Sequence, residues 1–432
     1  MILKNGTVVT MNSDFEVFKG DIRIQGDSIQ ELGTLSAYAG EEVIDLGGKV
    51  VIPGLIQTHV HLCQTIFRNR AEDRPLLRWL KEKIWVMEAG LTPETIRISA
   101  ELAIAELLKG GTTAVLTMET VHHTKVVLEA VRRGGIRAVV GKALMDRNDR
   151  GHPDDWVQSI EESLADIKQL CDEWQGAENG RIGICLAPRF ALSASRELLD
   201  KVLEFSEERG LLIHTHAAES QEETEEVRRE TGMGNIEYFH QLGLLSPKFC
   251  VAHCIWVDER EMDLLAWSGS QVLHCPTANM KLGSGMAPIA EMRDKGVSVS
   301  LGADGAACNN TLDMFQEMRL TGLIQKVRIG AEALPARDIF AMATLGGARA
   351  LGQEDKIGSI EVGKKADVVV LDLDKPHSVP GEQDIYTRIV YSARADDVDS
   401  VWVDGKMVVD RGKLLTLDEG EMVERAKRVM IQ

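Results

Sequence analysis

The chain has 432 residues, of which 44% are hydrophobic and 27% charged, a balance that supports a packed core and excludes wholesale disorder. Acidic residues number 67 against 49 basic ones, and the formal net charge of −18 argues against binding to a nucleic-acid backbone. No apolar run reaches the ~20 residues that span a bilayer, and the first ten residues show no secretory signal.

Both ends of the chain consist of short segments in which apolar and polar residues partly alternate, separated by turn residues such as Asn-Gly and Gly-Gly. This alternating pattern predicts one small composite β-sandwich domain made from residues 1–52 and 353–432. The expected strands cover residues 2–6, 7–11, 21–25, 42–45, 49–52, 366–371 and 398–405.

Residues 53–352 instead alternate strand-like apolar runs with segments of helical period. One helix is expected to have Thr92 as its N-cap and Pro93 at its first position, and to stop at Gly110. Interleaved strands and helices predict an α/β fold, a (β/α)₈ barrel; the alternative doubly wound sheet lacks a glycine-rich nucleotide motif after its first strand. The expected barrel strands are 55–59, 113–118, 138–145, 182–187, 211–216, 249–256, 271–275 and 297–302, and a second helix covers 197–209.

The seven cysteines form no CxxC pair, and several of them lie in apolar runs. An odd number without such a pair favours reduced thiols in a cytoplasmic protein, most of them buried and structural. The sequence therefore predicts neither a disulfide framework nor a cysteine metal site.

Histidines stand at or near the ends of several predicted barrel strands. His59 and His61 close the first one, and because residues i and i+2 of a strand share a face, both rings project together. Alone, this pair also fits two solvated rings at a strand end. However, His216 and His253 occupy the fifth and sixth runs and Asp304 follows the eighth, so all five side chains point to one barrel face. Together they predict a metal centre.

Imidazole and carboxylate ligands without a cysteine cluster suit Zn²⁺, with Fe²⁺ or another divalent ion as the alternative. A bound ion with an open position lowers the pKa of its water to about 7, and the resulting hydroxide can attack an electrophilic carbon. The sequence leaves open whether His214 is a further ligand or lies behind the ligands.

Three motifs carry a resemblance to a known family. They are Pro-Gly-Leu-Ile-Gln-Thr-His-Val-His at residues 53–61, Asn-Met-Lys-Leu-Gly-Ser-Gly-Met-Ala-Pro at residues 279–288 and Ile-Gly-Ser-Ile-Glu-Val-Gly-Lys-Lys-Ala-Asp at residues 357–367. With the downstream histidines and acids, the chain resembles the amidohydrolase superfamily over nearly its entire length. Within that superfamily it is similar to the aminohydrolase branch that holds methylthioadenosine/S-adenosylhomocysteine deaminases, 5′-deoxyadenosine deaminases, guanine deaminases and triazine chlorohydrolases.

The resemblance implies roles for the residues at the strand ends. Asp304 would accept a proton from the activated water, His253 would orient that water, and Glu219 would carry a proton to the substrate's ring nitrogen. The fourth strand carries no lysine to bridge two metals, which favours a single ion, and Lys142 is either structural or substrate-facing. The implied metal ligands are His59, His61, His216 and Asp304.

The substrate-binding residues point to two substrate classes. Glu88 matches the glutamate that the methylthioadenosine/S-adenosylhomocysteine deaminases use on ribose hydroxyls, and a solvated loop residue is the alternative. Arg189 and Gln64 are instead similar to the arginine and glutamine with which guanine deaminases bind their base, and a nonspecific polar pocket lining is the alternative for both. Trp79 would supply either a wall for the heterocycle or ordinary packing.

The sequence thus predicts a metal-dependent hydrolase of cyclic-amidine C–N bonds that deaminates S-adenosylhomocysteine, methylthioadenosine or 5′-deoxyadenosine. The alternatives are a deaminase of a free purine base such as guanine, a triazine chlorohydrolase or aminohydrolase, and a non-catalytic scaffold of the same fold. The expected partner is a small purine nucleoside or base, without nucleic acid or membrane, in a homo-oligomer.

Overall fold

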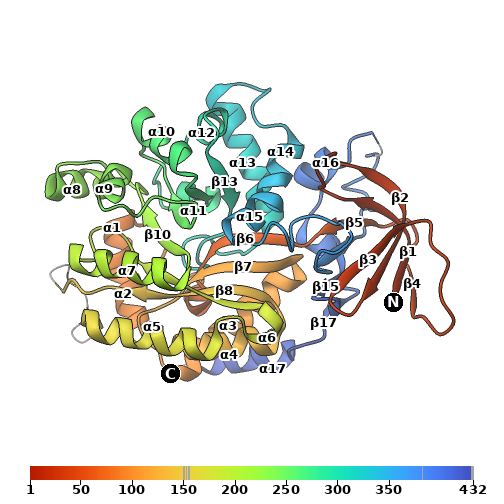
Figure 1. The fold of residues 1–432 in the computed structure, drawn as a ribbon, viewed down its shortest axis with the longest axis horizontal. Coiled ribbons are helices and arrows are strands. Elements are labelled where there is room, and N and C mark those ends of the chain that lie inside the picture. Colours follow the sequence, from red (N-terminus) through yellow and green to blue (C-terminus); the bar gives the residue numbers. More distant parts are fainter. Residues whose placement is uncertain (149–150, 152, 154–155, 382, 430–432) are drawn as a thin grey trace.

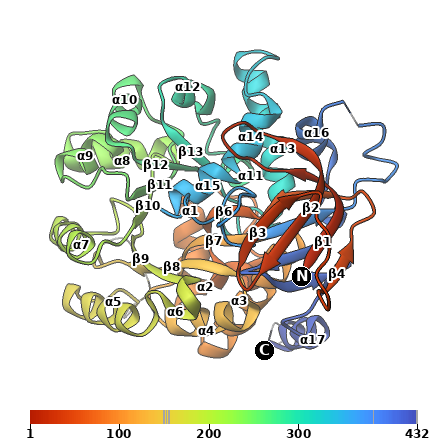
Figure 2. The ribbon, with the colours of Figure 1, turned by 45° about the vertical axis from the view of Figure 1, so that its right-hand side comes forward.

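The computed structural model describes residues 1–148, 151, 153, 156–381 and 383–429, and it consists of a barrel with a mixed β-sheet at its side (Figure 1). The barrel strands lie inside a ring of helices (Figure 2), and the mixed sheet lies at one side of the barrel, at the right in Figure 1. Within the described residues, no helix is long and apolar enough to cross a membrane.

Eight parallel strands form the barrel in simple chain order. Its first and last strands meet through a parallel bridge between Val60 and Asp304 and through the bond that the Asp304 amide donates to the His59 carbonyl, 2.9 Å long. The predicted (β/α)₈ barrel is therefore confirmed. The strands are β6 (Leu55–Val60), β7 (Thr112–Met118), β8 (Arg137–Leu144), β9 (Ile182–Pro188), β10 (Ile213–Ala217), β11 (Phe249–His253), β12 (Gln271–His274) and β13 (Ser298–Leu301).

Four strands, β10 to β13, are shorter than the sequence predicted. β10 starts two residues later than expected, at Ile213, and β11 ends at His253 instead of running on to Trp256. At the end of β11 the backbone turns into the left-handed region, with φ of 73° at His253 and 48° at Cys254. Because this conformation breaks the strand, residues 254–256 leave the barrel wall as a loop.

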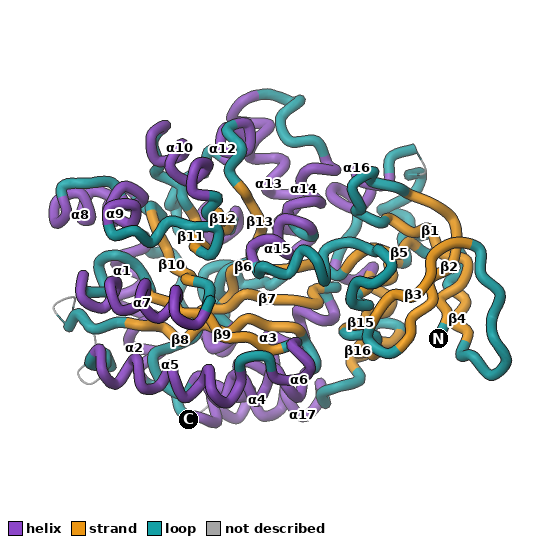
Figure 3. The backbone as a smooth tube through the Cα atoms, in the orientation of Figure 1, coloured by secondary structure: helices purple, strands orange, loops and turns teal. Residues whose placement is uncertain are grey.

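Most segments between the strands are helical, as the orange strands and purple helices of Figure 3 show. Thr92 caps α3 through the Thr95 amide, Pro93 is its first residue and Gly110 follows its last, as predicted. Ser195 caps α7. The barrel helices are η1 (Leu62–Phe67), α1 (Leu76–Trp79), η2 (Leu80–Ile84), α2 (Trp85–Ala89), α3 (Pro93–Lys109), α4 (Thr124–Gly134), α5 (Ile160–Trp174), α6 (Ala177–Gly180), α7 (Arg196–Arg209), α8 (Gln221–Thr231), α9 (Asn235–Gln241), α10 (Glu259–Ser268), α11 (Pro276–Lys281), α12 (Ile289–Asp294), α13 (Met314–Ile329), α14 (Ala336–Met342) and α15 (Leu345–Ala350).

The mixed sheet joins the two ends of the chain, which confirms the predicted composite β domain. Its central contact is the antiparallel pairing of β5 with β14, where Val51 lies opposite Val370. The strand order is β17-β16-β15-β14-β5-β1-β2-β3, with β4 paired to β1. The strands are β1 (Ile2–Val9), β2 (Val17–Gln25), β3 (Ser28–Gly33), β4 (Val43–Asp45), β5 (Val50–Pro53), β14 (Val368–Leu371), β15 (Val398–Val403), β16 (Lys406–Asp410) and β17 (Lys413–Leu414).

The Asn-Gly pair at residues 5–6 does not turn the chain. Asn5 takes a φ of 60° and produces a bulge, so the two strands expected at 2–6 and 7–11 are a single strand, β1. The remaining elements are α16 (Ile385–Thr387), η3 (Arg388–Ser392), η4 (Ala395–Asp397) and α17 (Glu419–Val429), which packs on α3.

All seven cysteines are buried and free, which agrees with the prediction of reduced structural thiols. Burial raises the pKa of these thiols; that of Cys250, for example, rises to about 12. A thiol with so high a pKa stays protonated and unreactive at neutral pH.

A buried ion-pair network joins the barrel to the mixed sheet. Arg137, at the start of β8, donates two bonds of 2.8 and 3.0 Å to Asp367 and also pairs with Asp404. The Asp404 amide donates to the same Asp367 carboxylate at 2.8 Å. The guanidinium is 1% exposed, so each carboxylate compensates a charge that water cannot reach.

We predict that Asp367→Ala destabilises the protein by roughly 3–5 kcal/mol, because it leaves the Arg137 charge buried and half-paired. The free energy of unfolding, measured with a chemical denaturant, tests this. Asp399→Asn is the matched control: it removes the half-exposed ion pair with Lys49 and should change stability by at most about 1 kcal/mol. Equal losses in the two variants would contradict the prediction.

Candidate metal centre and substrate pocket

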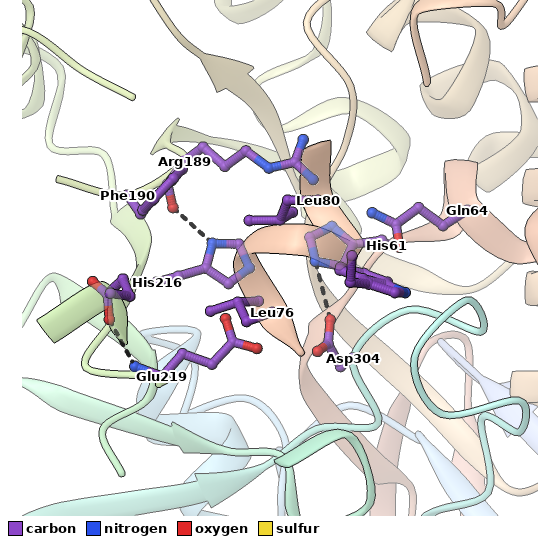
Figure 4. Close-up of a pocket in the computed structure, with 11 residues that line it drawn as sticks. His61, Gln64, Leu76, Leu80, Arg189, Phe190, His216, Glu219 and Asp304 are labelled. Atoms are coloured by element: carbon purple, nitrogen blue, oxygen red, sulfur yellow. Dashed lines mark hydrogen bonds and ion pairs between the residues drawn. The ribbon is translucent and has the colours of Figure 1, made fainter. Parts of the chain in front are cut away.

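The C-terminal ends of the barrel strands bring the predicted metal ligands together. The carboxylate of Asp304, just after β13, lies 3.1 Å from Nε2 of His61 and 3.4 Å from Nε2 of His59, both at the end of β6. His216 on β10 completes the group, and one ligand atom from each of the four residues lies within 4.8 Å of the others. Figure 4 shows His61, His216 and Asp304 facing one another across the pocket.

Backbone carbonyls fix the orientation of two of these rings. Nδ1 of His61 donates to the carbonyl of Met118 at 2.6 Å, and Nδ1 of His216 donates to the carbonyl of Arg189 at 2.7 Å. Since a carbonyl only accepts, each Nδ1 carries the proton and each Nε2 presents its lone pair to the centre.

His214 orients the ring of His59 in the same way. Nδ1 of His214 donates to the carbonyl of Thr117 at 3.3 Å, which leaves its Nε2 as an acceptor. That Nε2 accepts from Nδ1 of His59 at 2.7 Å, so Nε2 of His59 is left as a lone pair directed at Asp304. His214 therefore lies behind the candidate ligands and outside their group.

The charge states of these groups suit a cation. Burial lowers the pKa of His59 to about 4 and holds that of His216 well below its usual value, so both rings are neutral. Burial alone would raise the pKa of Asp304, but the adjacent rings of His59 and His61 hold it well below its usual range. Nε2 of His59 is also buried without a hydrogen-bond partner among the described residues. Two neutral imidazoles, those of His59 and His216, together with the ring of His61 and the carboxylate of Asp304 fit a divalent metal ion.

The three predicted catalytic residues lie together at the same edge. Nε2 of His253 is 3.5 Å from the Glu219 carboxylate and 4.0 Å from that of Asp304, and its Nδ1 is 2.8 Å from Oδ1 of Asn279. Burial, aided by the Asp304 charge, raises the pKa of Glu219 well above its usual value. A carboxyl group that holds its proton is suited to act as an acid.

The backbone is left-handed at Asp304 and at Ala218, the residue before Glu219. Ala218, next to Glu219, has a φ of 50°, and Asp304 itself has a φ of 63°. Non-glycine residues in this region store strain that the surrounding structure must hold. The parallel strands therefore end in sharp turns that direct the two side chains inward.

Two supporting acids were missed by the sequence analysis. Glu223, in the first turn of α8, accepts from the Glu219 amide at 3.0 Å, and burial raises its pKa to about 8. Glu119, after β7, accepts from the amides of Leu62 and Cys63 and so fixes the chain that follows His61. The only sequence signal for Glu223 is its spacing of four residues from Glu219.

The candidate substrate cavity is lined by three of the candidate ligands, His61, His216 and Asp304. Leu76, Trp79 and Leu80, from α1 and η2, form an apolar wall. The predicted Gln64 and Arg189 also line this cavity, whereas Lys142 does not and instead donates to the carbonyl of Val121 at 2.6 Å. The full lining is His61, Gln64, Leu76, Trp79, Leu80, Arg189, Phe190, His216, Glu219, Glu223 and Asp304 (Figure 4).

Glu88 is buried beside the cavity but outside its lining. Its carboxylate accepts two bonds from Arg189, of 2.7 and 3.1 Å, and one from Nε2 of Gln64 at 2.8 Å. The structure thus brings three predicted substrate-binding residues into one hydrogen-bonded cluster. Of the three, only Gln64 and Arg189 face the cavity.

Comparison with known proteins agrees with this geometry. A family model described as the amidohydrolase family matches residues 50–408. A 5′-deoxyadenosine deaminase of Methanothermobacter thermautotrophicus is 39% identical, over 95% of this chain and 93% of its own length. A 5-methylthioadenosine/S-adenosylhomocysteine deaminase of Moorella thermoacetica is 36% identical, over 100% of this chain and 99% of its own. The crystal structure of an adenosine deaminase from Xanthomonas campestris with bound zinc superposes with a TM-score of 0.93 at 30% identity, covering 100% of this chain and 97% of that one.

We predict that His214→Asn weakens metal binding about 10- to 100-fold, because Nδ1 of His59 loses the acceptor that orients its ring. Competition with a chelator of known affinity measures this change. The control is His240→Asn on the exposed surface of α9, which should leave the affinity unchanged. Unchanged affinity in the His214 variant would show that the ring of His59 needs no such support.

Proposed function

The chain belongs to the amidohydrolase family, and from this we propose that it deaminates an adenosine-type nucleoside: S-adenosylhomocysteine, methylthioadenosine or 5′-deoxyadenosine. The observation that carries the proposal is the meeting of three imidazoles, Asp304 and the acidic group of Glu219 at one cavity. The names of the relatives over the full chain support the nucleoside class.

The donor set supports a single divalent ion held by His59, His61, His216 and Asp304. The zinc in the related adenosine deaminase favours Zn²⁺. When bound, such an ion supplies the positive charge that makes a neighbouring water molecule acidic. The absence of a lysine on β9 supports one ion over a bridged pair, and the seven free thiols support a cytoplasmic location.

The chain's own residues then move the protons. Asp304 accepts the proton of the attacking water, and His253, held through Nδ1 by Asn279, orients that water with its Nε2 acceptor. Glu219 gives its proton to the ring nitrogen beside the attacked carbon, which makes that carbon electrophilic. After a further proton reaches the amino group, ammonia leaves. The apolar wall of Leu76, Trp79 and Leu80 covers the purine and excludes water.

Glu219→Gln should retain the metal but lower kcat at least about 100-fold, because an amide cannot deliver the proton. Ammonia release and metal content, measured on the same preparation, test this expectation. Glu222→Gln, at the exposed start of α8, is the control and should behave like the unmodified protein. Full turnover in the Glu219 variant would remove this residue from the mechanism.

Ammonia release from a substrate panel tests the proposed function directly. The panel contains the three adenosine derivatives, guanine and a chlorinated triazine. We expect turnover of the adenosine derivatives, and we expect removal of the metal by a chelator to abolish it. Turnover of guanine with inert nucleosides would replace the proposal by a free-base deaminase, and chloride release from the triazine would replace it by a dehalogenase.

A further inference from the structure

We infer that Glu88 is a positioning residue that sets the polarity of the cavity wall through Gln64 and Arg189. It is 3% exposed and absent from the lining, so its carboxylate does not present a free face to the substrate. Its two neighbours do line the cavity, and Glu88 determines which of their atoms remain available there. This inference rests on the proposed function, because it concerns how the same site selects its substrate.

The orientation of the Gln64 amide follows from the chemistry of its partner. A carboxylate only accepts hydrogen bonds, so the side of the amide that faces Glu88 must carry the NH₂ group. The observed 2.8 Å contact joins Nε2 of Gln64 to Oε1 of Glu88. The planar amide therefore turns its oxygen away from Glu88.

That oxygen is an acceptor in need of a donor. Oε1 of Gln64 is buried and has no hydrogen-bond partner among the described residues. It lies beside Gly305, the residue after Asp304, so closely that a Cβ atom added at position 305 would collide with it. A buried acceptor without a partner is unfavourable, so a donor group of the substrate, an N–H or O–H, would stabilise it.

Arg189 is restrained by the same carboxylate. Its two terminal nitrogens both bind Glu88, which fixes the plane of the guanidinium. Its backbone carbonyl meanwhile accepts from Nδ1 and from the amide of His216, at 2.7 and 3.0 Å. Arg189 thus connects the Glu88 cluster to His216, a candidate metal ligand. Because two nitrogens of the guanidinium already bind Glu88, Arg189 has fewer N–H groups free for a purine carbonyl than an arginine that binds guanine would need.

The polarity of the wall can be changed without changing its shape. In Glu88→Gln, the new amide uses its oxygen for Arg189 and turns its NH₂ toward Gln64. Gln64 must then accept, so it flips and presents NH₂ to the cavity, where a substrate donor meets another donor. We expect KM for 5′-deoxyadenosine to rise roughly tenfold with kcat nearly unchanged, since the lost contact is present in both ground and transition states.

The decisive variant exchanges the two side chains, Gln64→Glu with Glu88→Gln. The net charge is preserved, and the new amide at position 88 donates to one oxygen of the new carboxylate at position 64. The other oxygen of that carboxylate faces the cavity as an acceptor. We expect KM to return to within about threefold of the unmodified protein, because an acceptor again meets the substrate donor. A direct contact between Glu88 and the ribose predicts no recovery, because position 88 still carries an amide, and that result would overturn the inference.

A second pair of variants keeps the test decisive if the exchanged protein does not fold. Gln64→Met removes the whole amide, both its acceptor and the bond that it donates to Glu88. Glu88→Gln then has no amide to reorient, so adding it to Gln64→Met should raise KM by clearly less than Glu88→Gln does alone. Additive increases would overturn the inference. Glu82→Gln, an exposed residue of the same covering segment, is the matched control, and metal content and thermal unfolding of every variant identify purely structural damage.

The same experiment separates this inference from the proposed function. If the unmodified protein releases no ammonia from any adenosine derivative, the proposed function fails, whatever the variants do. If it deaminates 5′-deoxyadenosine but the exchange restores nothing, only the role assigned to Glu88 fails.

Discussion

The structure of the site depends on burying one carboxylate, Asp304, among imidazole rings whose orientations are fixed by their neighbours. A buried carboxylate is stable only beside a compensating partner, so the imidazole rings around Asp304 must keep fixed orientations. These orientations are set from behind the site. The carbonyls of Met118 and Arg189 and the ring of His214 each fix one imidazole, which leaves the facing nitrogens directed at Asp304.

The same constraint governs the substrate wall. Glu88 is as deeply buried as Asp304, and its compensation comes from the guanidinium of Arg189 and the amide of Gln64. The two groups that face the substrate are thereby held by a carboxylate that does not line the cavity. A nucleoside would then be selected by the unpartnered oxygen of Gln64 and by the apolar wall of Leu76, Trp79 and Leu80. A single charged contact would matter less.

The fold and the candidate ligands could largely be predicted because both follow from local patterns. Strand periodicity placed His59 and His61 on one face, and the order of strands in a barrel brought His216 and Asp304 to the same end. The supporting residues could not be found this way. Glu119 and Glu223 act through backbone amides, and apart from the four-residue spacing between Glu219 and Glu223 nothing in their local sequence distinguishes them from solvated acids. The bulge at Asn5 likewise looked like a turn, since the same left-handed residue serves both.

The sequence by itself determined which side chains stand at the strand ends, and therefore that a divalent metal ion and hydrolytic chemistry suit them. Only the tertiary structure decided which atoms of those side chains meet. Glu88 contacts Gln64 and Arg189, which are 24 and 101 positions away, because the segment containing α1, η2 and α2 folds over the mouth of the barrel. The hydrogen bonds between segments that are distant in sequence depend on this packing, so no local sequence pattern predicts them.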